Sequence, residues 1–188
     1  MISFKPLEEE DFELLNTWIN MDFVSNWYDR RKFIFDNVEK KYRFERKDYV
    51  LVDSFIVQID SIPIGYIQKY TISDYFDYAA CMQVSFTSVG IDMFIGEKAY
   101  MYKGFGKDIV KQFIIYFIFP MPNSDQVIAS PDPRDKAAIS MYEKAGFTYL
   151  KTVMCGENGH KEYVMILRKS KDNIIYPAQS SDATLSLE

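Results

Sequence analysis

One stretch near the middle of the chain constrains the fold most, because it joins an apolar strand to an amphipathic helix through a turn with two glycines. We expect the strand over residues 89–95 and the helix over residues 104–117, and the turn reads Tyr-Lys-Gly-Phe-Gly-Lys over residues 102–107. Glycines permit a tight turn and a close approach to a ligand, and the start of a helix carries unpaired N–H groups. These groups and the helix dipole suit a pyrophosphate, with Lys103 and Lys107 as countercharges.

The same turn lacks the fingerprints of the two common nucleotide-binding loops. Ile109 stands where the pattern G-x-G-x-x-G requires its third glycine, and the sequence Gly-Lys-Ser/Thr does not occur. An ordinary turn with a glycine before a helix therefore stays open as an alternative.

The other segments alternate in type along the chain. We expect strands at residues 2–7, 54–59, 64–72, 89–95, 126–129, 148–153 and 162–169, and helices at 10–20, 34–44, 104–117 and 135–145. Residues 73–88 lose their periodicity, so we expect a long loop there, with a strand inside it as an open alternative. This order predicts an α/β fold with a central mixed sheet of about seven strands flanked by about four helices. We expect one domain over residues 1–169 and a poorly ordered tail over residues 170–188.

Composition limits the partners and the location of the chain. A net charge of −5 and a pI near 5.0 argue against nucleic-acid and anionic-membrane partners; they suit a cationic substrate, although ordinary solubility also explains them. Cys81 and Cys155 form no C-x-x-C motif, so neither a disulfide framework nor a zinc site is expected. From the acidic N-terminus we expect no signal peptide, and residues 113–120 are too short to cross a bilayer. We expect a cytoplasmic protein.

Three further stretches stand around the glycine turn. They read Pro-Ile-Gly-Tyr over residues 63–66, Gly-Ile-Asp-Met-Phe-Ile over 90–95 and Ala-Ile-Ser-Met-Tyr-Glu-Lys-Ala-Gly-Phe over 138–147. Together with the turn, they resemble the GNAT superfamily of N-acetyltransferases, and within it the aminoglycoside 6′-N-acetyltransferases. The superfamily motif is Gln/Arg-x-x-Gly-x-Gly/Ala, from which this chain departs at Met101. The resemblance covers roughly residues 2–169.

The resemblance implies that acetyl-CoA is the co-substrate and that no metal takes part. In the family the coenzyme lies where two parallel strands splay, with its pyrophosphate on the glycine turn. The resemblance implies a coenzyme site made by Phe94, Ile95, Met101, Tyr102, Lys103, Gly104, Phe105, Gly106, Lys107, Asp135, Ala138 and Tyr142.

Two residues are candidates for catalysis. An acceptor amine must lose a proton before it attacks, and Asp92 is the candidate to orient the amine and take that proton, directly or through water. By resemblance, Tyr142 would donate a proton to the departing thiolate. In the alternative interpretation both residues are structural: Asp92 is a carboxylate whose hydrogen bonds are made within the protein, and Tyr142 only packs in the core. His160, the only histidine, is expected to be exposed, so no Ser-His-Asp or Cys-His unit is expected.

The resemblance also implies a small-molecule amine as acceptor, most specifically the 6′-amine of an aminoglycoside. Carboxylates and aromatic rings suit such a cation, and the candidate acceptor residues are Trp27, Tyr28, Asp74, Asp77, Asp92 and Ser130. The relatives carry Asp, Asn and Arg where this chain has Ser130, Asp135 and Ala137. Two alternatives therefore stay open: acetylation of another amine or hydroxylamine (a polyamine, a peptide N-terminus or a siderophore precursor), and a CoA-binding regulatory domain without turnover. We expect a monomer or a weak homodimer.

Overall fold

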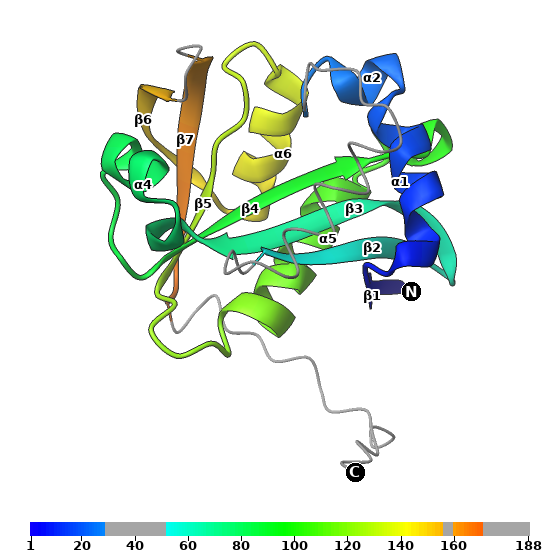
Figure 1. The fold of residues 1–188 in the computed structure, drawn as a ribbon, viewed down its shortest axis with the longest axis horizontal. Coiled ribbons are helices and arrows are strands. Elements are labelled where there is room, and N and C mark those ends of the chain that lie inside the picture. Colours follow the sequence, from blue (N-terminus) through cyan, green and yellow to red (C-terminus); the bar gives the residue numbers. More distant parts are fainter. Residues whose placement is uncertain (29–51, 156–159, 171–188) are drawn as a thin grey trace.

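A seven-stranded sheet forms the centre of the molecule (Figure 1). The computed structural model describes residues 1–28, 52–155 and 160–170. Its strands are β1 (Ile2–Pro6), β2 (Val52–Ile59), β3 (Ile62–Thr71), β4 (Ser88–Ile95), β5 (Gln126–Ala129), β6 (Thr148–Cys155) and β7 (His160–Arg168). The strand order is β1-β2-β3-β4-β5-β7-β6, and every pair is antiparallel except the parallel pair of β4 and β5.

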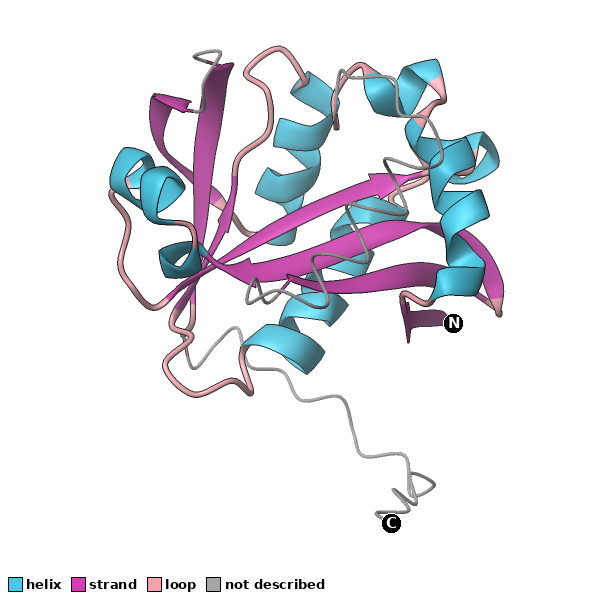
Figure 2. Cartoon of the chain, viewed as in Figure 1, coloured by secondary structure: helices cyan, strands magenta, loops and turns pink. Residues whose placement is uncertain are grey.

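Helices cover both faces of this sheet (Figure 2). Within the described ranges the α-helices are α1 (Phe12–Ile19), α2 (Asp22–Ser25), α4 (Phe76–Met82), α5 (Phe105–Phe113) and α6 (Lys136–Ala145). Short 3-10 turns lie at Glu9–Asp11, Ile72–Asp74 and Lys98–Tyr100, and α5 continues as a π-helical segment over Ile114–Ile118. The helix expected over residues 34–44 lies outside the described residues.

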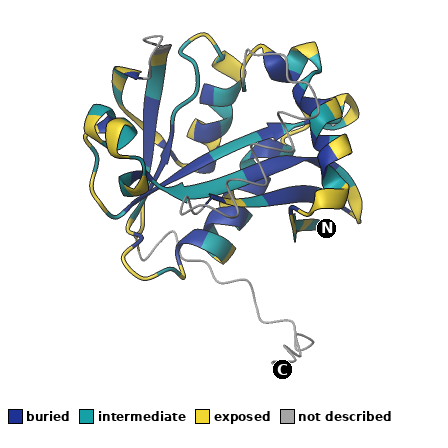
Figure 3. Ribbon diagram, in the orientation of Figure 1, coloured by how far each residue is buried: buried dark blue, intermediate teal, exposed yellow. Residues whose placement is uncertain are grey.

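Buried apolar side chains divide into three clusters, and the central strands β2 to β5 carry many of them, whereas β6 is largely exposed (Figure 3). The largest cluster joins α5 and α6 to one face of the sheet, through residues such as Ile67, Ile91, Ile109 and Phe113. On the other face, Trp18 of α1 packs against Phe94 of β4. There α4 belongs to a separate cluster with Ile128, Val164 and Ile166. The expected α/β fold with about seven strands is confirmed, and α2 and α4 are helices that the sequence did not predict.

The expectation of a loop over residues 73–88 is wrong. The structure places a 3-10 turn and then α4 in this stretch. The sequence shows no apolar residues at helical spacing here, because α4 buries little: Met82 is its only buried residue, and Phe76 is 84% exposed. A short helix with so little buried surface leaves no apolar period to detect.

A disulfide also corrects the sequence analysis. Cys81 on α4 is bonded to Cys155 at the end of β6, although no disulfide was expected. The two cysteines lie 74 residues apart, and only the fold brings α4 against β6. In the described part of the chain, no helix is long and apolar enough to cross a membrane.

Candidate active site

Two parallel strands separate in the middle of the sheet. β4 pairs with β5 only over Ser88–Gly90, opposite residues 126–128. On its other side β4 stays paired with β3 as far as Ile95. β5 ends at Ala129, so the edge of β4 beyond Gly90 has no pairing with β5. Backbone N–H and C=O groups on such an edge can bind a ligand in the way that they would bind a strand.

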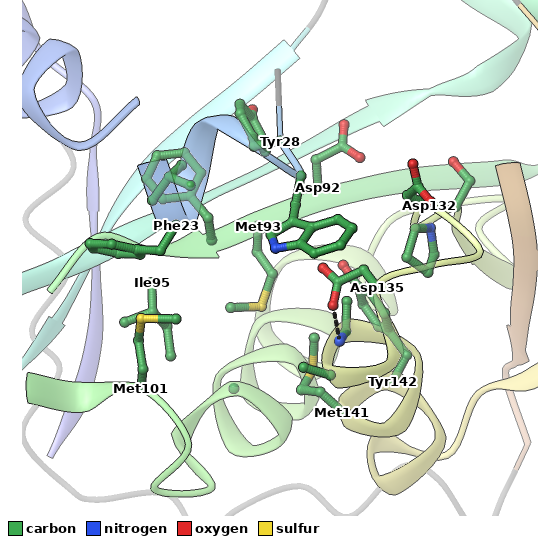
Figure 4. A pocket seen from close by; sticks show the side chains of 18 of the residues that line it. Phe23, Tyr28, Asp92, Met93, Ile95, Met101, Asp132, Asp135, Met141 and Tyr142 are labelled. Atoms are coloured by element: carbon green, nitrogen blue, oxygen red, sulfur yellow. Dashed lines mark hydrogen bonds between the residues drawn. The ribbon is translucent and has the colours of Figure 1, made fainter. Parts of the chain in front are cut away.

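A cavity of about 410 Å³ lies at this separation (Figure 4). Consecutive residues 92–95 all line it, although neighbouring side chains of a strand point to opposite faces. The cavity therefore follows the edge of β4. Its wall is completed by residues from α2 and the segment after it, from β3, from Met101 and the glycine turn, from the loop between β5 and α6, and from α6. They are Phe23, Val24, Trp27, Tyr28, Gln68, Met101, Tyr102, Gly106, Ser130, Pro131, Asp132, Asp135, Ala137, Ala138, Met141 and Tyr142.

The glycine turn meets one end of the cavity. Tyr102 and Gly104 have positive φ values of 57° and 87°, and α5 begins directly after Gly104 without a side-chain cap. A Cβ atom built on Gly104 meets nothing within 4 Å, so the space before the helix is open. At Gly106 the same atom would lie 2.9 Å from Cγ of Met141, which explains why α5 needs a glycine where it approaches α6. The turn therefore fits an anionic group such as a pyrophosphate.

The predicted coenzyme residues divide into two groups. Phe94, Ile95, Met101, Tyr102, Gly106, Asp135, Ala138 and Tyr142 line the cavity. Lys103, Gly104, Phe105 and Lys107 lie in the turn and the start of α5, beside the cavity but outside its wall. The Lys107 ammonium is paired with Asp108 at 2.7 Å, so its charge is shared with a neighbour on the same helix.

Asp92 reaches the cavity at the end of a chain of hydrogen bonds. Gln68, directly opposite on β3, donates from Nε2 to Oδ2 of Asp92 at 2.8 Å. The Tyr66 hydroxyl donates to Oε1 of Gln68 at 2.6 Å, and Oγ of Ser54 lies 2.8 Å from the Tyr66 hydroxyl. The buried Tyr66 ring is stacked on Phe94, with centroids 5.5 Å apart. These hydrogen bonds fix the Gln68 amide and, through it, one oxygen of the Asp92 carboxylate.

Tyr142 enters the cavity from α6 and is only 5% exposed. Burial, together with the charges of Asp92 and Asp135, raises the pKa of Tyr142 above the ordinary tyrosine value. Its ring also packs edge-on against Phe147, with centroids 5.3 Å apart. At the start of the helix, Asp135 accepts a hydrogen bond from the backbone N–H of Ala138 at 2.9 Å, which is the dashed line in Figure 4. This cap holds the first turn of α6 at the cavity.

The acceptor candidates are brought together only in part. Trp27, Tyr28, Asp92 and Ser130 line the cavity, and the ring of Tyr28 lies 4.7 Å from that of Phe94. Asp74 and Asp77 do not line it, because they lie in the 3-10 turn and in α4, where both are exposed.

Sequence reasoning missed several residues of the wall. Gln68 lies opposite Asp92 in the pairing of β3 with β4, and that register cannot be read from the sequence because α4 stands between the two strands. Asp132 is held on one side by Arg134, whose Nε and Nη2 donate to its two oxygens at 2.9 and 2.8 Å. The apolar members Phe23, Pro131 and Met141 carried no signal in the sequence.

A protein family and several known proteins are similar to this chain. A family model described as "Acetyltransferase (GNAT) domain" matches residues 8–155. Aminoglycoside N(6')-acetyltransferase type 1 of Klebsiella pneumoniae and that of Serratia marcescens are each 25% identical over 154 residues, which cover 81% of this chain and 76% of theirs.

Solved structures show the same fold. Aminoglycoside acetyltransferase AAC(6')-Ib in complex with coenzyme A has a TM-score of 0.80 at 23% identity, covering 90% of this chain and 95% of its own. Spermidine N-acetyltransferase from Vibrio cholerae, in complex with CoA and spermine, has a TM-score of 0.69 at 16% identity, covering 89% of this chain and 95% of its own. Since the family model matches most of its length, the chain belongs to the GNAT acetyltransferase family.

Proposed function

We propose that this protein transfers the acetyl group of acetyl-CoA to the 6′-amine of an aminoglycoside. The observation that carries the proposal is the cavity along the unpaired edge of β4, with the glycine turn beside one end and Asp92 in its wall. The similarity to aminoglycoside N(6')-acetyltransferases supports the choice of acceptor. Aromatic rings at Trp27 and Tyr28 and the carboxylate of Asp92 suit a cationic sugar.

In this proposal the coenzyme binds through groups of two kinds. N–H groups of the glycine turn and of the start of α5 would hold its pyrophosphate, with Lys103 nearby as a cation. Backbone groups on the edge of β4, over residues 92–95, would hold the pantetheine arm and face the thioester carbonyl. Donors fixed before the reaction stabilise the oxyanion that develops in the transition state.

Transfer would proceed by direct attack. The amine nitrogen forms a bond to the acetyl carbon, Asp92 takes a proton from the nitrogen directly or through water, and the carbon–sulfur bond breaks to leave the coenzyme thiolate. The Tyr142 hydroxyl would donate a hydrogen bond to that sulfur and then its proton. Because the charge of Asp92 helps to raise the pKa of Tyr142, protonation of Asp92 makes Tyr142 a better acid at the step that needs one.

Thiol release from acetyl-CoA tests this function. We expect release with kanamycin or tobramycin, and none above background when the drug is omitted. Spermidine is the comparison amine, because it is cationic but lacks the sugar ring. Turnover of spermidine without turnover of either drug would contradict the aminoglycoside as acceptor, and no turnover with a panel of amines would contradict the enzyme itself.

A further inference from the structure

A row of polar side chains crosses one face of the sheet beside the cavity. Ser54 on β2, Gln68 on β3 and Asp92 on β4 are consecutive partners in the strand register. The row continues at Ser130, just after β5, and at Glu162 on β7. It separates the apolar cluster under α1 from the one under α4.

Tyr78 of α4 joins the last two members of this row. Its hydroxyl donates to Oε2 of Glu162 at 2.8 Å and lies 2.9 Å from Oγ of Ser130. A tyrosine hydroxyl has a single proton, and a carboxylate can only accept. The proton of Tyr78 therefore points at Glu162, and Ser130 must donate its own proton to the Tyr78 oxygen.

The direction of the Ser130 proton matters for the cavity, because Ser130 lines it and Glu162 does not. With its proton directed at Tyr78, the Ser130 oxygen offers only lone pairs to a bound molecule. That end of the cavity is therefore built to accept a hydrogen bond from a ligand.

Several contacts hold this arrangement in place. The disulfide between Cys81 and Cys155 ties α4, which carries Tyr78, to β6. The ring of Tyr70 lies over Gly90, where a Cβ atom would come within 2.4 Å of it, and burial, Asp92 and Tyr78 raise the pKa of this buried tyrosine. Burial and the charge of Glu162 raise the pKa of Tyr78, so its hydroxyl keeps its proton.

We propose that Glu162 is a positioning residue that acts through Tyr78 to make Ser130 a hydrogen-bond acceptor for a second ammonium group of the amine substrate. The inference rests on the proposed function and specifies its acceptor as a molecule with at least two amines. One amine lies at Asp92 for acetylation, and the second binds at Ser130. An ammonium is favoured over a hydroxyl there because the charges of Glu162 and Asp92 both act on Tyr78, whose hydroxyl lies 2.9 Å from Ser130.

The test replaces Glu162 with glutamine. Glutamine removes the negative charge, and its amide can donate to the Tyr78 oxygen as well as accept from it, so Ser130 is no longer held as an acceptor. We expect Glu162→Gln to raise the KM for kanamycin at least about tenfold, because a charge-assisted hydrogen bond is lost. The kcat and the KM for acetyl-CoA should change less than about twofold.

Two comparisons separate this role from a structural one. The KM for 6-amino-6-deoxyglucose, which keeps the reacting amine but has no second amine, should not change. Glu162→Asp keeps the charge and should recover most of the affinity for kanamycin. Glu143→Gln removes one charge from an exposed position on α6 and should leave both acceptors unaffected.

The outcomes are distinct. An unchanged KM for kanamycin in Glu162→Gln would overturn the inference. An equal rise in the KM for kanamycin and for 6-amino-6-deoxyglucose would overturn it too. So would a fall in kcat that accompanies a fall in the thermal unfolding midpoint, because both would then follow from a damaged fold. If Glu162→Gln does not fold, Ser130→Ala should show the same selective rise in KM, and its absence would equally overturn the inference. Failure of the proposed function would look different, because the unaltered protein would then acetylate neither acceptor.

Discussion

At the scale of single residues, the amide of Gln68 fixes one oxygen of Asp92. Gln68 donates to one of the carboxylate oxygens, and the amide of Gln68 is itself fixed because Tyr66 donates to Oε1. The acid thus keeps one orientation toward the cavity before any substrate binds. A proton acceptor fixed in this way contributes by proximity as well as by basicity.

Replacement of Asp92 by asparagine keeps its size and removes its basicity. We expect Asp92→Asn to lower kcat by about 10²- to 10⁴-fold, the usual contribution of a general base, while acetyl-CoA binding measured by calorimetry persists. Asp53→Asn is the matched control, since this exposed carboxylate pairs with Lys69 and does not line the cavity. Full activity in Asp92→Asn would remove the assigned role.

The raised pKa of Tyr142 predicts how kcat depends on pH. Its pKa lies above the ordinary value near 10, so the hydroxyl keeps its proton as pH rises through that value and loses it only at the higher, folded-state pKa. We expect Tyr142→Phe to lower kcat about 10²-fold, with the ratio to the unaltered enzyme constant from about pH 7 to pH 10. A ratio that falls toward one near pH 10 would show that Tyr142 ionises normally.

At the scale of elements, the splay of β4 from β5 creates the site, and the sequence predicted both strands. It predicted the glycine turn and α6 as well, because glycines and helix ends leave local signals. Gln68 and Asp132 were missed because their place in the site follows from register and loop path. Asp74 and Asp77 were misplaced for a related reason: a stretch without periodicity was interpreted as a loop facing the substrate, and it folds as α4.

The disulfide between α4 and β6 leads to a prediction about stability. Breaking the bond between Cys81 and Cys155 should lower the free energy of unfolding by about 2–4 kcal/mol, because a long loop is released in the unfolded chain. Thermal unfolding with and without dithiothreitol measures the effect, and a variant with both cysteines changed to serine is the control that dithiothreitol should not shift. Two titratable thiols in the unfolded, unreduced protein would contradict the bond.

At the scale of the whole molecule, the fold was predictable because strands and amphipathic helices follow one another with clear periods. The two polar chains that flank the cavity, one ending at Asp92 and one at Glu162, were not predictable. They depend on side chains from four strands and α4 that meet only when the sheet is complete. Long-range contacts of this kind leave no pattern in a single sequence.

The central claim is that one cavity holds the thioester and the amine together, so that the amine beside Asp92 attacks directly. Initial rates of thiol release, with acetyl-CoA and kanamycin both varied, test it most directly. Direct transfer predicts double-reciprocal lines that intersect, because both substrates must be bound before the thiol leaves. Parallel lines, the sign of an acetylated enzyme formed before the amine binds, would contradict the account.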